Sequence, residues 1–219
     1  MSLRSFTAAL ALPAIAAAGI LSPQHAAAVS ISGEISQITG PIDLSNFNDP
    51  TGLRLLVEKQ NVQLATPLSV HFTGTGDFDE IADVGVTTIA AGTVVSSYYV
   101  VGNTSNGDFQ GSIVFDGDEQ IVAVIGLASS PGDMGFTNAA QAVFGLPDVT
   151  YPSSQQGIDI PPAGGPDVFS ISPDAQTLTF DFSTGSLGDD FRIITVVPEP
   201  ASAGLLGAVM FSLASRRRR

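Results

Sequence analysis

Alternating apolar and polar residues dominate the chain between positions 29 and 197. The pattern is clearest at 68–73 and 178–182, where Leu, Val or Phe occupies every second position. A period of two is typical of a β-strand with one buried face. Alternation at 29–32, apolar, β-branched and aromatic runs around Gly92 at 86–101, and apolar stretches beside turn residues predict further strands. These strands are 29–32, 53–64, 86–101, 112–115, 120–127 and 191–197.

Turn-forming residues separate these stretches. The run 116–119, Asp-Gly-Asp-Glu, predicts a hairpin turn between two strands. One short helix is predicted at 138–144, capped by Thr137 and ended by Gly145 and Pro147. The whole pattern predicts a mainly β protein, an antiparallel β-sandwich of the jelly-roll kind with one short helix.

The N-terminal residues have the features of a secretory signal peptide. Arg4 supplies a positive charge, residues 6–21 are mostly apolar, and Ala26 and Ala28 form a small-residue cleavage site. A buried N-terminal helix is disfavoured, because this stretch has no polar face for solvent. We expect a signal helix that signal peptidase removes after Ala28.

The C-terminal residues fall into three parts. Pro198, Glu199 and Pro200 come first, and two prolines so close together cannot lie inside a regular helix. The uncharged, mostly apolar run 201–214 then predicts a transmembrane helix, and a basic cluster after it indicates the cytoplasmic side. Fourteen helical residues reach only about 21 Å, so an ordinary tail anchor or an interfacial helix is the alternative. The basic cluster consists of Arg216, Arg217, Arg218 and Arg219.

This order of Pro-Glu-Pro motif, apolar helix and basic end resembles the PEP-CTERM sorting signal of exported bacterial proteins. The resemblance implies that an exosortase-type membrane transpeptidase recognises the motif and cuts the tail. It also implies export, contact with the membrane only through the C-terminal helix before processing, and delivery to the cell surface or an extracellular polysaccharide matrix. The expected domains are a signal peptide at 1–28, a β-sandwich body at 29–196 and a sorting signal at 197–219.

Three segments of the body, 97–101, 109–118 and 189–195, resemble the body of one group of uncharacterised PEP-CTERM proteins. That group has no activity to transfer. The second resemblance therefore supports the expected fold and sorting, and it implies nothing about catalysis.

The body is strongly acidic. Twenty of the 21 Asp and Glu residues lie within 29–196, against Arg54, Lys59 and Arg192, so its net charge is −17 (3 − 20). Nucleic acids and anionic membrane surfaces are not expected as partners, because binding them requires Lys and Arg. The chain has no Cys, which excludes disulfides and thiol chemistry.

Four carboxylates lie close together at Asp77, Asp79, Glu80 and Asp83, after two glycines. Closely spaced carboxylates on a flexible loop are ligands that Ca²⁺ prefers, so these residues form a candidate Ca²⁺ site. The spacing does not match an EF-hand, and a solvated acidic turn is the plainer interpretation. The acidic run 116–119 allows the same two interpretations.

The other residues that could carry chemistry are few. His71, the one histidine of the body, is expected on the polar face of a strand, and no nucleophile elbow or zinc motif accompanies it. Tyr98 and Tyr99 are adjacent in a strand, so at most one is expected in the core, with the other exposed. Arg192 is expected to pair with a carboxylate.

No catalytic residue is assigned, and two hypotheses about function follow. The first is a non-catalytic surface or matrix protein that associates with extracellular polysaccharide. The alternative is a secreted hydrolase of the glycosidase kind that uses two of the many carboxylates. The absence of Trp weakens both, because aromatic side chains commonly hold sugar faces.

Overall fold

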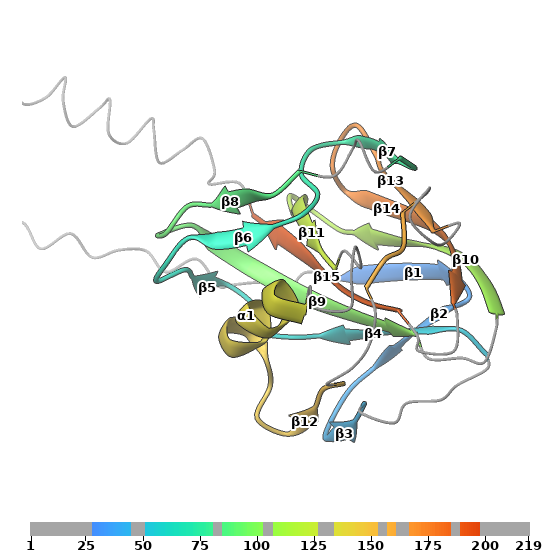
Figure 1. Ribbon diagram of the computed structural model, residues 1–219, viewed down its shortest axis with the longest axis horizontal. Helices are drawn as coiled ribbons and strands as arrows, with labels where there is room; N and C mark the ends of the chain where they lie inside the picture. The colour runs from blue at the N-terminus through green and yellow to red at the C-terminus, as the bar shows by residue number, and fades with distance from the viewer. Residues whose placement is uncertain are drawn as a thin grey trace, which may run out of the picture.

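Two β-sheets packed face to face form the body of the protein (Figure 1). The structure, a computed structural model, describes residues 28–44, 51–80, 85–102, 107–126, 134–152, 157–160, 167–184 and 189–197. The first sheet contains, in spatial order, β1 (Val29–Gly33), β10 (Gly107–Phe115), β14 (Thr177–Thr184), β13 (Val168–Ile171) and β7 (Gly76–Phe78). The second contains β11 (Gln120–Ile125), β15 (Asp189–Val196), β9 (Val94–Gly102), β4 (Leu53–Val57) and β2 (Ile35–Ile38), and β5 (Val62–Gln63) also pairs with β9.

Short elements complete the described fold. β6 (Leu68–Val70) pairs with β8 (Thr87–Ile89), and β3 (Ile42–Asp43) pairs with β12 (Val149–Thr150). The helix α1 spans Met134–Phe144. The mainly β prediction is confirmed. Most pairings are antiparallel, but β2 with β4 and β3 with β12 are parallel, which the sequence pattern did not predict.

The core between the two sheets follows the predicted alternation. Leu178, Phe180 and Phe182 of β14 all point inward and are buried. They face Val100 of β9 and Ile193 of β15 across the sandwich. The predicted helix is also confirmed, although it begins at Met134, so its start lies before the expected cap at Thr137.

The second sheet is buried on both faces. On its outer side Ala140 and Phe144 of α1 pack with Leu68 and Val95. A separate cluster joins Tyr151, near β12, to residues of β4 and β9. One sheet of this sandwich therefore has a covered outer face, whereas no element of the described ranges covers the outer face of the other.

The predicted hairpin at 116–119 is wrong. β10 pairs with β1 and β14, and β11 pairs with β15 in the other sheet, so this turn carries the chain from one sheet to the other. The predicted strand 53–64 is also interrupted. It divides into β4 and β5, and Asn61 between them has a φ of 55°, which ends regular pairing.

Candidate functional site

The uncovered outer face of the five-stranded sheet is polar. On β14, Thr179 and Asp181 point outward and alternate with inward-facing Leu and Phe side chains. On β10, Gln110 and Ser112 also point outward. Pairing registers align one residue from each of the five strands into a single row. Neighbouring strands lie about 4.8 Å apart, so the row is about 19 Å long. The row consists of Ser32, Ser112, Thr179, Ser170 and Asp77.

An open hollow of about 650 Å³ lies over this face. Four residues of the row line it, Asp79, Gln110 and Asp181 add further polar groups, and the rest of the lining is Gly111, Val168, Phe169 and Phe180. The described residues that line the hollow include three carboxylates and no Lys, Arg or His. The site therefore offers hydroxyl groups beside negative charge. Sequence reasoning missed it, although the outward positions of 177–183 are all Thr, Asp or Ser.

Hydrogen bonds organise the polar groups of this face. The hydroxyl groups of Ser32 and Ser112 lie 2.8 Å apart, and Gln110 Nε2 donates to Asp181 Oδ2 at 3.0 Å. A hydroxyl both donates and accepts, and an ionised carboxylate only accepts. The arrangement suits a ligand rich in hydroxyl groups, with or without amines.

Gly111 allows β1 and β10 to lie close together. It lies on the inner side of β10, and a Cβ there would be 2.5 Å from Ser32 O and 2.7 Å from the Phe180 ring. A larger residue would push β1 away from β10. The row of hydroxyl groups depends on this close approach.

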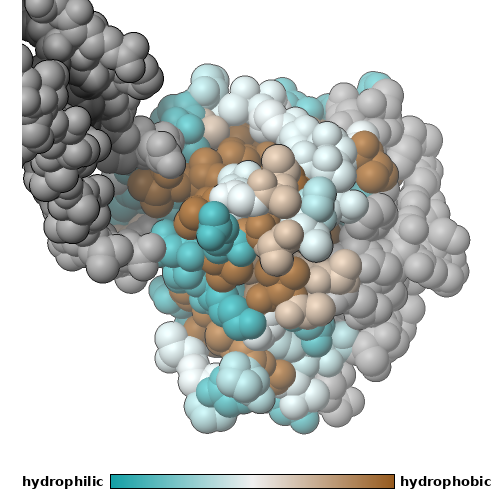
Figure 2. Space-filling model, turned by 90° about the vertical axis from the view of Figure 1, so that its left-hand side faces the viewer, coloured by the Kyte–Doolittle hydropathy of each residue, from teal (hydrophilic) through white to brown (hydrophobic). Residues whose placement is uncertain are grey.

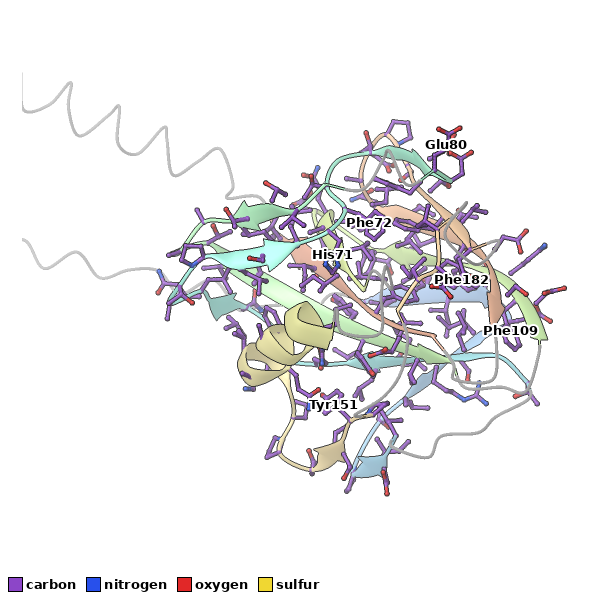
Figure 3. The ribbon with its side chains drawn as sticks, in the orientation of Figure 1. His71, Phe72, Glu80, Phe109, Tyr151 and Phe182 are labelled. Atoms are coloured by element: carbon purple, nitrogen blue, oxygen red, sulfur yellow. The ribbon has the colours of Figure 1, made fainter. Side chains whose placement is uncertain are left out.

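The candidate Ca²⁺ site is only partly described. Asp77 and Asp79 line the hollow, and Glu80 lies at the edge of the body near β7 (Figure 3). No group of three or more His, Cys, Asp or Glu side chains that could hold a metal ion occurs among the described residues. Asp83 lies outside those residues, so the four-carboxylate site stays a prediction.

The second acidic run does not form an exposed cluster. Asp116 and Asp118 are exposed, but Glu119 is buried and accepts hydrogen bonds from Tyr98 at 3.0 Å and from Thr195. Burial raises the pKa of Glu119. This carboxylate fastens the turn between the sheets to the core and is not available as a surface ligand.

The expected surface position of His71 is wrong. His71 is 2 % exposed and lies inside the body beside Phe72 (Figure 3). Its Nδ1 accepts a hydrogen bond of 3.1 Å from the backbone N–H of Gly126. The neighbouring segments of β8 and β11 bury the His71 side chain, which strand periodicity had placed in solvent. The residue has a structural role here.

The prediction for the tyrosine pair is half right. Tyr98 and Tyr99 point to opposite faces, but both are buried. Tyr98 lies in the core between the sheets, and Tyr99 lies under the second cover with Tyr151 at a ring distance of 5.1 Å. Neither ring is an exposed platform for a sugar.

Arg192 pairs with a carboxylate, as predicted, and the partner is Glu58. Its Nε lies 3.0 Å from Glu58 Oε2, and both side chains are fully buried. Ser97 also donates to this carboxylate at 2.6 Å. The guanidinium lies over the rings of Tyr99 and Tyr151, at 4.7 and 5.4 Å. This network lies under the cover of the second sheet, away from the hollow.

Two further carboxylates are buried. Asp190 accepts a hydrogen bond of 2.7 Å from Tyr99, and its Oδ1 has no partner among the described residues. Asp167 accepts backbone hydrogen bonds from Asp159 and Ser183. Burial raises the pKa of Asp190 and of Asp167 to about 6. Neither lines the hollow.

The predicted sorting and cleavage residues lie almost wholly outside the described residues. Ala28 is described and exposed, directly before β1. Ala26, the motif 198–200 and the arginines 216–219 are not described, so these calls stay predictions. Within the described ranges no helix has the length and apolarity needed to cross a membrane.

Comparison with known proteins returned no match: no family model, no curated protein and no solved structure resembles this chain closely enough to be reported.

Proposed function

We propose that this chain is an exported, non-catalytic protein of the cell surface or extracellular matrix, delivered by a signal helix and a PEP-CTERM sorting tail. Its jelly-roll-like body binds polysaccharide. The row of hydroxyl groups and carboxylates over the outer face of the five-stranded sheet is the observation that carries the binding proposal.

The charge of the hollow narrows the class of polysaccharide. Asp77, Asp79 and Asp181 repel uronic acid or sulfate groups, and none of the described residues that line the hollow offsets them. The hydroxyl groups of neutral sugars can form hydrogen bonds with the Ser and Thr hydroxyls of the hollow, and the amines of amino sugars can also pair with its carboxylates. We therefore expect neutral or amine-bearing polysaccharide in preference to an acidic one.

The placement of the carboxylates supports binding over hydrolysis. A glycosidase needs one protonated carboxyl group and a second carboxylate across the sugar. The carboxyl groups whose pKa burial raises most, Asp167 and Asp190, are inside the body. Asp167 accepts a hydrogen bond from the backbone N–H of Asp159, Asp190 accepts one from the hydroxyl of Tyr99, and neither lines the hollow.

A binding assay with oligosaccharides of glucosamine and of uronic acid tests this proposal. We expect the glucosamine oligomer to bind and the uronate oligomer not to bind at equal ionic strength. Thr179→Val removes one hydroxyl and weakens binding about two- to tenfold, the value of one hydrogen bond. Thr177→Val, on the same strand outside the hollow, is the matched control.

Two results would contradict the proposal. Equal loss in both threonine variants would mean that the hollow is not the binding site. Release of shortened oligosaccharides, abolished by Asp181→Asn, would establish the hydrolase instead.

A further inference from the structure

The acidic residues of the body are unevenly distributed. Residues 59–76 and 84–107 contain no Asp or Glu, and Lys59 is their only charged residue. In the described fold these runs supply β5, β6, β8 and β9. We call the described residues 62–75 and 85–95, which include β5, β6, β8 and the start of β9, the carboxylate-free lobe.

The tip of this lobe is formed by two loops that lie side by side. Leu64 N donates to Thr93 O at 2.9 Å, and Gly92 N donates to Leu64 O at 2.8 Å. The exposed residues around these bonds are uncharged, and apart from Gln63, whose Nε2 donates to Gly92 O at 3.4 Å, they are small or apolar. The small or apolar ones are Ala65, Thr66, Pro67, Ala90, Ala91 and Val94.

Further apolar surface lies on the same side of the molecule. Figure 2, which views the molecule from the side of β5, β6 and β8, shows hydrophobic patches interspersed with hydrophilic ones on this face. The exposed large apolar side chains of the described residues are Val86, Val94 and Val197, at 65 %, 45 % and 52 %. Two of the three belong to the lobe, and the third belongs to the last described residue of the chain.

The described chain ends beside this lobe. Val196 packs against the same apolar cluster as Val62 and Ile89. The apolar run 201–214 begins four residues after Val197, and four residues span at most about 14 Å. A tail inserted in a bilayer therefore holds this side of the body close to the membrane surface.

Charge makes the lobe the suitable side to face the membrane. Carboxylates near a low-dielectric bilayer lose hydration, and anionic lipids repel them. Gln120 of β11 pairs with Val196, and the exposed acids Asp116 and Asp118 belong to the turn before β11 and not to the lobe. We propose that the carboxylate-free lobe lies against the lipid surface while the tail is inserted. This inference rests on the proposed membrane insertion of the tail.

The absence of Cys allows a direct test with single-cysteine variants of the chain that begins at Val29, so that the tail is the one expected membrane helix present. Ala91→Cys and Thr66→Cys place a fluorescent label at the lobe tip. Ser36→Cys places it on β2, which pairs through β4 with the opposite end of β9. The chain is reconstituted in phosphatidylcholine vesicles that carry a nitroxide quencher on the lipid headgroup. We expect a severalfold larger loss of fluorescence at the lobe tip than at position 36.

A charge variant and a flotation control separate the two proposals. Ala91→Asp combined with the label at position 66 lowers the quenching, while the chain still floats with the vesicles. Flotation with equal quenching at positions 66, 91 and 36, or with none, overturns the inference and leaves the tail insertion standing. A chain that does not float with vesicles overturns both the tail insertion and the orientation that rests on it.

Discussion

The buried pair of Glu58 and Arg192 makes the sharpest prediction about stability. Glu58→Gln keeps the size of the side chain and an oxygen that can accept from the guanidinium, but it removes the charge. In the wild type Arg192 Nε donates to Oε2 at 3.0 Å and Nη2 donates to Oε1 at 3.2 Å. The NH2 group of the glutamine cannot accept either bond, so a buried cation keeps a single, neutral acceptor. Breaking a buried ion pair from one side costs about 3–5 kcal/mol. That is a large part of the roughly 5–15 kcal/mol that stabilises a domain.

Urea denaturation of the mature protein, followed by far-UV circular dichroism, measures this cost. The double variant Glu58→Leu with Arg192→Met removes both charges of the pair, although it also removes the acceptor of Ser97 and the cation that lowers the pKa of the buried Asp190. We expect it to be more stable than Glu58→Gln, because the buried cation that lacks its charged partner is gone. Asp118→Asn, an exposed carboxylate, is the control and changes stability by about 0.5 kcal/mol at most.

The reasoning fails if Glu58→Gln costs less than about 1 kcal/mol, the range of solvent-exposed pairs. It also fails if the double variant is as unstable as the single one. Either result would mean that Arg192 does not depend on Glu58 for its charge balance.

Three further predictions follow. Burial raises the pKa of Asp190 and of Asp167 from an ordinary value of 3.8 to about 6, so the stability that their protonation contributes is complete below about pH 4 and is lost as the pH rises through 6. Asp190→Asn should therefore flatten the decline of the urea midpoint between about pH 4 and 6, and an unchanged slope contradicts this. Gly111→Ala destabilises the protein by about 1–3 kcal/mol in the same assay, because its Cβ overlaps backbone of β1; a change below 0.5 kcal/mol would show that the strands can separate freely. If the loop 77–83 holds Ca²⁺, CaCl₂ raises the melting temperature more than NaCl of equal ionic strength does, and Asp79→Asn removes this difference. Equal shifts with the two salts indicate charge screening alone.

Local pattern predicted much of the fold because it reports which side chains alternate. Period-two alternation predicts the strands around Leu68 and Phe180, β-branched and aromatic runs predict the strand around Val94, and the cap and breakers predict the helix. Arg192 is expected to pair because it is one of few cations in a strongly acidic body. These conclusions need only local sequence and elementary electrostatics.

The wrong predictions concern which distant elements cover a strand or pair with it. Alternation places His71 and one of the two tyrosines in solvent, but the segments of β8 and β11 bury His71, and the segment around Tyr151 covers Tyr99. The turn 116–119 has hairpin composition, but the partners of its strands come from distant parts of the chain. Pairing between distant segments leaves no signal in a short window.

The candidate binding site was missed for a similar reason. Ser32, Ser112, Ser170 and Thr179 come from four separated segments, and each alone resembles an ordinary outward residue of a strand. Only the pairing registers align them in one row. The carboxylates Asp77 and Asp79 were selected from the sequence, but as metal ligands and not as one side of a polar hollow.

Export and removal of the tail are the central claim, and the mass of the exported protein tests them most directly. Intact mass spectrometry of the protein recovered outside the cell should give a chain that begins at Val29 and lacks Arg216–Arg219. A protein that retains its N-terminal residues and its arginines, or that stays inside the cell, would contradict the account.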